Sequence, residues 1–282
     1  MFVIIGYIIV VGAVVGGFVA SGGHVAVLLQ PFEILIIFGA ALGAFISGNS
    51  ITNIKSSLSA ATGTLKPSKQ NKAYYSELVL VFFALSQTIR KEGLLSLEGI
   101  IEDPKSNPIF TPKILADHHL MDFICDNLRL LVVGIEEYQL EELMDQNLEV
   151  HHEDGHAPIK AVQRIGDAMP AFGIVAAVMG VVHTMGSLHL PPAELGKLIA
   201  AALVGTFLGI LISYGFIAPV ASTMEERLEA EGNAFKCAQK GIMCCAKGIS
   251  PPMTAEYMRA MISASMRPSF SELEAQLKAT KG

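Results

Sequence analysis

Four long apolar stretches divide the chain. Residues 1–21, 34–49, 169–188 and 198–221 contain no Asp, Glu, Lys or Arg. A helix needs about 20 mostly apolar residues to cross the hydrocarbon core of a bilayer, and the second stretch reaches that length if its helix starts near Leu29. The pattern therefore predicts four transmembrane helices, at about 1–21, 29–49, 169–188 and 198–221.

The regions outside these stretches have the pattern of water-soluble helices. Leu115 to Gly134 places apolar residues three or four apart, and Glu136 to His151 continues with acidic residues between leucines. The apolar runs Leu78–Leu85 and Leu130–Ile135 are too short to cross a membrane, so we expect them to be buried faces of soluble helices.

Together these elements predict an all-α polytopic membrane protein. Its predicted parts are, in order, a transmembrane hairpin at 1–49, a large helical domain at 50–168, a second hairpin at 169–221 and a helical tail at 222–282. Within the tail, a helix from about Ser222 to Lys247 is expected to be followed by a break and shorter helices.

Basic residues lie almost entirely on one side of the predicted spans. Residues 50–168 hold eleven Lys and Arg and residues 222–282 hold eight, whereas the two connections within the hairpins hold only Lys197. Connections rich in Lys and Arg stay on the cytoplasmic side of a membrane. We therefore expect both termini, the large domain and the tail to be cytoplasmic.

Overall composition excludes one class of partner and favours a reduced compartment. The 20 basic and 26 acidic residues give a net charge of −6, which provides no long-range attraction for the phosphates of nucleic acids. The spacing of Cys125, Cys237, Cys244 and Cys245 fits neither a zinc site nor a disulfide framework. Residues 1–21 lack the basic start and the small-residue cleavage site of a signal peptide, so we expect the first span to be retained.

Glycine pairs with four-residue spacing occur in the predicted spans. Such pairs let helix backbones approach closely in lipid, where packing replaces the hydrophobic effect as the driving force. They predict close helix contacts, either within one bundle of four helices or between subunits. The pairs are Gly12 with Gly16, Gly39 with Gly43, and Gly205 with Gly209.

The spans lack an acidic residue near the middle of the membrane. Proton and cation pathways usually place Asp, Glu or His there, facing a cavity. This chain offers only Glu33 and Asp167 at span ends, and His183 near the outer end of the third span. If the protein moves ions, we expect a partner to donate the carboxylate.

Prolines and hydroxyl residues mark the second hairpin. Pro170 and Pro219 both lie at the predicted cytoplasmic boundary, where we expect each to start or stop a helix. Thr206, Ser213 and Thr184 could line a polar path, although hydroxyls in helices more often bond back to their own backbone.

Two histidine-containing segments offer nitrogen and oxygen donors for a metal. The run from Glu149 to His156 includes His151, His152 and His156, and Asp117-His118-His119 is a second candidate. We expect both to be solvated, the first in a flexible acidic stretch, and predict no metal site. The sequence also lacks HExxH, P-loop, GxSxG and strand-linked GxGxxG motifs, so it predicts neither an enzyme nor a bound cofactor.

A compact charge cluster surrounds a predicted helix break at Gly93. Its members are Arg90, Lys91, Glu92 and Glu98. The residues by themselves favour a solvated helix face.

Five segments, in order along the chain, carry a resemblance to a known family: Gly6–Tyr7, Gln30–Glu33, Pro170–His183, Val204–Leu211 and Arg267–Phe270. They resemble the flagellar motor stator proteins of the MotA type, within the MotA/TolQ/ExbB proton channel family. The resemblance runs nearly from end to end. It implies a multi-pass protein of the bacterial inner membrane that forms a proton channel with MotB and drives flagellar rotation.

The resemblance also implies partners. In that family five MotA-like chains surround a MotB dimer, whose membrane helix supplies the aspartate that takes up and releases the proton. This would account for the acidic residue missing here. The resemblance further implies that Arg90 and Glu98 contact the rotor protein FliG.

Residues of the second hairpin match other functional positions of the family. Pro170 and Pro219 correspond to prolines tied to proton-coupled conformational change, and Thr206 to a threonine that faces the ion path. Sodium-driven relatives have a threonine where this chain has Ala177, which favours H+ as the transported ion.

Alternative functions differ in their expected topology and flux. An energiser of the ExbB or TolQ type generally has three spans with its amino terminus outside, whereas this pattern predicts four spans with the amino terminus inside. A non-conducting membrane scaffold would carry no proton flux. A membrane enzyme is the weakest alternative, since no nucleophile with a base can be assembled from the motifs.

Overall fold

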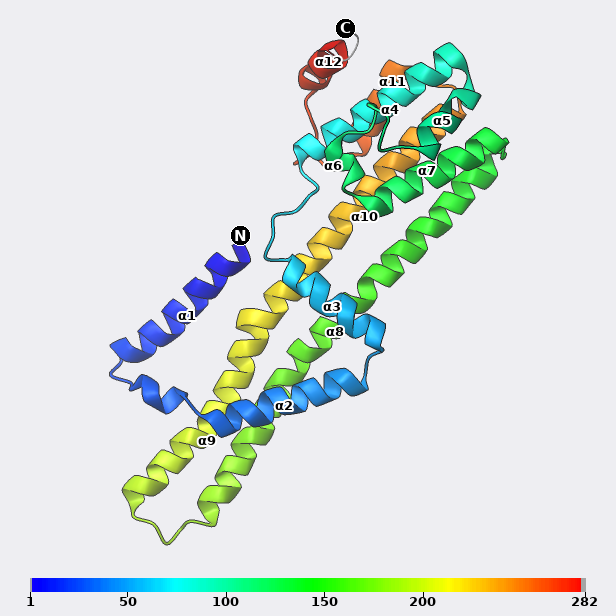
Figure 1. Cartoon of the computed structure of the whole chain (residues 1–282). Helices are drawn as coiled ribbons and strands as arrows, with labels where there is room; N and C mark the ends of the chain where they lie inside the picture. The colour runs from blue at the N-terminus through cyan, green and yellow to red at the C-terminus, as the bar shows by residue number, and fades with distance from the viewer. Residues whose placement is uncertain (1, 280–282) are drawn as a thin grey trace. The chain divides into compact units, whose positions relative to one another are not determined.

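A computed structural model describes residues 2–279 (Figure 1). Residue 1 of the first predicted span and residues 280–282 of the predicted tail lie outside the described residues. Within 2–279 every regular element is helical: α1 (Phe2–Ala20), η1 (Val25–Leu28), α2 (Pro31–Ser47), α3 (Ile51–Gly63), α4 (Lys72–Glu92), η2 (Leu94–Ser96), α5 (Leu97–Glu102), α6 (Pro112–Leu115), α7 (His118–Val133), α8 (Glu137–Met185), α9 (Pro192–Ile212), η3 (Ser213–Ile217), α10 (Ala218–Ala246), α11 (Pro251–Met261) and α12 (Phe270–Ala279).

The chain folds into two compact units. Unit 1 comprises Met1–Pro67 and Asp154–Glu226, and unit 2 comprises Ser68–Glu153 and Arg227–Gly282. The helices α8 and α10 each contribute residues to both units.

The four apolar stretches form helices that are long and apolar enough to cross a membrane. They lie in Val3–Ala20, Val25–Ser47, Glu137–Met185 and Pro192–Ala246. Many of their large apolar side chains point outward; Ile8, for example, is 67% exposed. Exposed apolar side chains on such helices suit a lipid environment or a neighbouring subunit, so the prediction of an all-helical membrane protein with four apolar helices is confirmed.

Pro170 does not start a helix. It lies inside α8, as does Pro158, and α8 continues over 49 residues. The prediction of a helix boundary at Pro170 was therefore wrong. A proline removes one backbone hydrogen bond and crowds the carbonyl four residues earlier, and a long helix packed against neighbours can tolerate that local loss. The carbonyl that the Pro170 ring crowds belongs to Gly166, which is buried.

The histidine run is also helical. His151, His152 and His156 lie in the middle of α8, so the expected flexible stretch is wrong. Histidine and aspartate have modest helix propensity and glutamate a higher one, and here they belong to a helix whose buried residues include Leu140, Met144 and Ile159.

Unit 2 is built around α4. Its run Leu78–Leu85 is almost entirely buried, which confirms the prediction for this segment. The helix packs along α11, and α10 approaches it so closely that a Cβ on Gly241 would lie 2.6 Å from the Phe82 ring. The central helix of unit 2 is thus covered on several sides.

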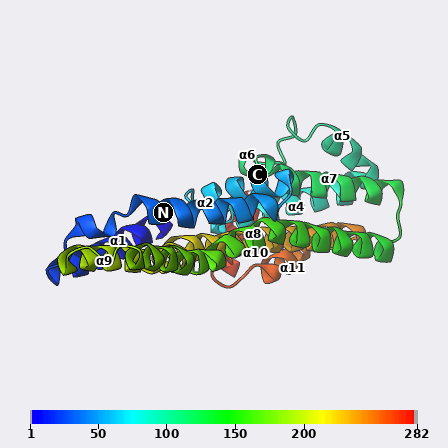
Figure 2. The same ribbon diagram turned by 90° about the horizontal axis from the view of Figure 1, so that it is seen from below.

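The helices α5, α6 and α7 form a second layer of unit 2. Both α5 and α6 pack on α7, and the connection between them arches over α7 (Figure 2). The side-chain hydroxyl of Thr111 caps α6 by accepting from the Ile114 N–H, and α7 ends at Gly134, whose φ is 93°. A positive φ at this position suits glycine because it has no Cβ.

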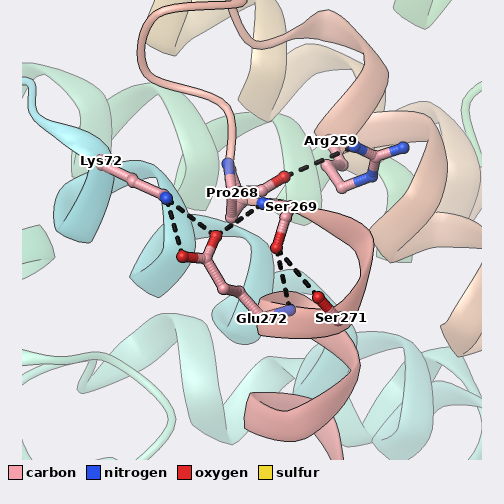
Figure 3. A network of polar contacts seen from close by, with 6 residues as sticks. All are labelled: Lys72, Arg259, Pro268, Ser269, Ser271 and Glu272. Carbon is pink, nitrogen blue, oxygen red and sulfur yellow. Dashed lines mark hydrogen bonds and ion pairs between the residues drawn. The ribbon is translucent and has the colours of Figure 1, made fainter.

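The tail follows the predicted pattern of a helix, a break and shorter helices. After α10, Gly248 has a φ of 61° and turns the chain into α11. The last helix, α12, begins with a reciprocal cap (Figure 3): Ser269 N–H donates to Glu272, and Glu272 N–H donates to the Ser269 hydroxyl. Lys72 at the start of α4 then pairs with Glu272 at 2.7 Å.

Candidate functional site

In unit 1 the helices α8 and α9 touch along glycines, and Figure 1 shows them side by side as a hairpin. A Cβ on Gly209 would lie 2.6 Å from the Met169 carbonyl oxygen, and one on Gly173 would lie 2.8 Å from that of Gly205. Both distances are shorter than real Cβ contacts, so no side chain fits there. The predicted close packing at Gly205 and Gly209 is confirmed.

The other glycine pairs face open space within this chain. A Cβ added at Gly12, Gly16, Gly39 or Gly43 would meet nothing within 4 Å among the described residues. The prediction that glycines pack within one bundle of four helices is therefore wrong for these four residues. The sequence could not make this distinction, because all three pairs have the same spacing.

Thr206 on α9 and Ala177 on α8 are the two residues predicted for the ion path. They lie at the same height along the contact between the two helices. A Cβ on Gly205, the neighbour of Thr206, would lie 3.2 Å from the backbone nitrogen of Ala177. The Thr206 side chain is half-buried, and its hydroxyl makes no hydrogen bond within residues 2–279. By contrast, the Thr184 hydroxyl donates to the Gly180 carbonyl at 2.9 Å, as hydroxyls in helices commonly do.

Pro219 follows a π-helical turn and is the second residue of α10. The turn η3 carries α9 into α10, and the N–H of Ala218 donates to the Ser213 carbonyl five residues earlier. In a regular α-helix the Pro219 ring would crowd the Gly215 carbonyl, and the wider π turn gives that ring room. The predicted start or end of a helix at Pro219 agrees with the start of α10 at Ala218, although the preceding residues remain helical.

Tyr7 fixes α1 to this turn. Its hydroxyl donates to the Phe216 carbonyl at 2.8 Å, and the two rings lie 4.9 Å apart. Because the bond joins residues 209 positions apart, sequence reasoning noted Tyr7 only as part of a resemblance and missed its contact.

In unit 2, Arg90 and Glu98 lie on either side of the turn at Gly93. Arg90 is in the last turn of α4 and Glu98 in the first turn of α5. Both side chains are exposed, and Gly93 ends α4 with a φ of 85°, so the predicted helix break is confirmed. The positions suit the charges, since helix carboxyl termini favour cations and amino termini favour anions.

Comparison with known proteins identifies the family. Residues 4–93 match the family described as Motility protein A N-terminal, and residues 115–236 match the MotA/TolQ/ExbB proton channel family. The chain is 43% identical over 284 residues to Motility protein A of Salmonella typhimurium, with 100% of this chain and 96% of that protein covered. The chain belongs to the MotA family.

Two solved structures resemble this MotA-family chain. MotAB of C. jejuni matches with a TM-score of 0.80 at 20% identity, covering 95% of this chain and 98% of that one. The flagellar MotAB stator complex of Bacillus subtilis matches with a TM-score of 0.76 at 26% identity, covering 90% and 92%. The family places the protein in the bacterial inner membrane.

The histidines of this MotA-family chain have structural neighbours. The His151 ring lies 4.5 Å from the Phe235 ring, and its Nε2 lies 3.8 Å from a Glu231 carboxylate oxygen. No group of three or more His, Cys, Asp or Glu side chains suited to a metal occurs in the described part of the chain. His183 is exposed in the last turn of α8.

The remaining candidate residues of unit 2 support its core. The Tyr74 hydroxyl donates to a carboxylate oxygen of the buried Asp117 at 2.8 Å, which gives Asp117 a structural role. Burial, reinforced by this carboxylate, raises the pKa of Tyr74. All four cysteines are buried free thiols, and burial raises the pKa of Cys125 to about 11, which keeps that thiol protonated and unreactive.

Proposed function

We propose that this chain is the ion-conducting subunit of a flagellar motor stator, which with MotB forms a proton channel and converts ion-motive force into torque. The observation that carries the proposal is 43% identity to Motility protein A along the whole chain. Four apolar helices also favour this function over an energiser of the ExbB or TolQ type, for which three spans are expected.

A MotB dimer supplies the membrane aspartate in this proposal. The charge-free stretches 169–188 and 198–221 offer no acid of their own. The unbonded hydroxyl of Thr206 faces the proton path, and Ala177 on the adjacent backbone leaves no second hydroxyl to replace water around sodium. H+ is therefore the proposed ion, and no cofactor takes part.

Self-association supplies the rest of the channel wall. Gly12, Gly16, Gly39 and Gly43 form open, backbone-accessible faces on α1 and α2. Such faces favour contact with another helix in lipid. We assign them to neighbouring copies in a ring of five around the MotB dimer.

Protonation of the partner aspartate changes its charge and therefore its fit against the ring. One charge moved through 100 mV releases about 2.3 kcal/mol, enough to bias a conformational cycle. Pro170 and Pro219 are the proposed points of movement. The π turn before Pro219 supports this, because single π turns within long helices are frequent at functional sites.

The domain at 50–168 and the tail at 222–282 lie in the cytoplasm in this proposal, with both termini. Their surplus of Lys and Arg supports the placement. Arg90 and Glu98 then contact FliG on the rotor, and their exposure on a firmly held turn suits an electrostatic contact.

Cytoplasmic acidification tests the channel assignment. Cells would express this chain alone, or with a MotB partner that lacks its periplasmic plug segment. We expect acidification only with the partner, and its loss when the partner's aspartate becomes asparagine. An assembled complex without flux in either proton or sodium medium would instead support a non-conducting scaffold.

A further inference from the structure

The turn between α4 and α5 presents a leucine to solvent. Leu95 is 71% exposed, whereas Leu94 packs against the core of unit 2 and Leu97 is fully buried. The Ser96 hydroxyl donates to the Gly93 carbonyl at 2.6 Å. The turn is therefore held on both sides of Leu95, and the exposed leucine occupies a defined position.

Exposed charges without internal partners surround Leu95 in sequence. They make no ion pair or side-chain hydrogen bond within residues 2–279, whereas Lys72 at the other end of α4 is paired with Glu272. Charges without internal partners remain available to another molecule. The four are Arg90, Lys91, Glu92 and Glu98.

We propose that Leu95 is the apolar anchor of the surface through which unit 2 contacts the rotor. The occupant is the FliG surface that receives Arg90 and Glu98, and the proposal requires that surface to offer an apolar recess with charges opposite to those of the two residues. This inference rests on the proposed stator function and adds to it a residue that is not charged.

Physical reasoning favours a mixed surface over a purely charged one. Water and salt screen exposed ion pairs, so they contribute more to association rate and register than to affinity. An apolar side chain that enters a recess slows dissociation, and a polar rim excludes water around it. Leu95 is placed to slow dissociation by entering the recess, and its charged neighbours are placed to form the polar rim.

The test compares Leu95→Ala and Leu95→Asp with Phe270→Ala in the full stator complex. Phe270 is 63% exposed and is the first residue of α12, whose Glu272 pairs with Lys72 at the start of α4. That start is about 30 Å from the Leu95 turn, given 1.5 Å of rise per residue along α4. The two readouts are the residence time of stator units at a working motor and acidification through the unplugged complex.

We expect Leu95→Ala to shorten the residence time about fivefold to tenfold and Leu95→Asp to shorten it further. Acidification should be unchanged in both variants, and Phe270→Ala should match the parent in both readouts. If both Leu95 variants keep the residence time of the parent while Arg90→Glu shortens it, the proposal that Leu95 is an anchor is wrong and the rotor-facing assignment stands. If Arg90→Glu also has no effect, the rotor-facing assignment itself fails and the anchor fails with it.

Discussion

Unit 1 and unit 2 hold their helices together by different means. In unit 1, α8 and α9 meet backbone to backbone at Gly173, Gly205 and Gly209, while large apolar side chains point outward. In unit 2, large side chains such as Phe82 fill an interior core. One chain thus follows two packing rules, small residues where lipid removes the hydrophobic driving force and large residues where water supplies it.

The largest expected effect comes from emptying the core of unit 2. Phe82→Ala removes a fully buried ring, whereas Phe270→Ala removes the same ring from a position 63% exposed. We expect Phe82→Ala to destabilise unit 2 by about 3–5 kcal/mol and the control by far less. Protease protection of α4 and α7 measures the difference. Equal protection in the two variants would mean that unit 2 does not depend on this core.

The opposite kind of substitution should destabilise unit 1. Adding a methyl group at a glycine contact should lower its stability, whereas in unit 2 the loss comes from removing a large side chain. Gly209→Ala places a Cβ against the Met169 carbonyl, whereas Gly196→Ala on the same helix meets nothing within 4 Å. We expect a cost of about 1–3 kcal/mol for Gly209→Ala and little change for Gly196→Ala. Thermal unfolding of the purified complex measures it, and equal stability would argue against backbone contact between α8 and α9.

A smaller effect is expected at the bond between α1 and the π turn. Tyr7→Phe removes the donor to the Phe216 carbonyl and should cost about 0.5–1.5 kcal/mol. Tyr214→Phe is the matched control, because Tyr214 is 70% exposed. Thermal unfolding of the complex compares them. If the two variants are equally stable, the Tyr7 hydroxyl does not hold α1 in place.

The smallest effect concerns the attachment of α12 to unit 2, and it depends on pH. The hydrogen bond from Lys72, followed by those from Ser269, lowers the pKa of Glu272 to about 2. A lowered pKa in the folded state gives stabilisation that is complete above the ordinary value near 4.3 and is lost as pH falls toward 2. The protection factors of the α12 amides, in which the intrinsic pH dependence of exchange is divided out, should therefore fall over this range.

Glu272→Gln should remove that pH dependence by leaving the protection factors of α12 low above pH 4.3 as well. The control Glu274→Gln alters an acid that pairs with Lys278 within the same helix. Its exchange profile should follow the parent. A parent-like profile for Glu272→Gln would contradict the role of the Lys72 pair.

Local patterns were sufficient to predict many elements of this fold. The apolar stretches, the buried run Leu78–Leu85 and the break at Gly93 follow from composition over a few residues. Local rules failed at Pro170, because a rule for helix boundaries does not include the neighbours that sustain a long helix. The contact of Tyr7 with Phe216 could not be predicted either, since it depends on tertiary packing between distant segments.

The candidate site was predictable mainly through resemblance. Residue types alone predict a solvated face for Arg90 and Glu98, and their rotor contact stays a prediction from the resemblance. The position of Thr206 beside the Ala177 backbone and the exposure of Leu95 required the structure. Exposure and interhelical distance depend on the whole fold and are not properties of a short segment.

We propose that unit 1 conducts protons while unit 2 delivers torque. Stall torque and cytoplasmic acidification, measured in the same cells carrying Arg90→Glu and an unplugged MotB partner, test it most directly. The account predicts that torque falls several-fold while acidification stays at the parent rate, because Arg90 is exposed in unit 2. A parallel loss of torque and acidification would contradict this division of labour.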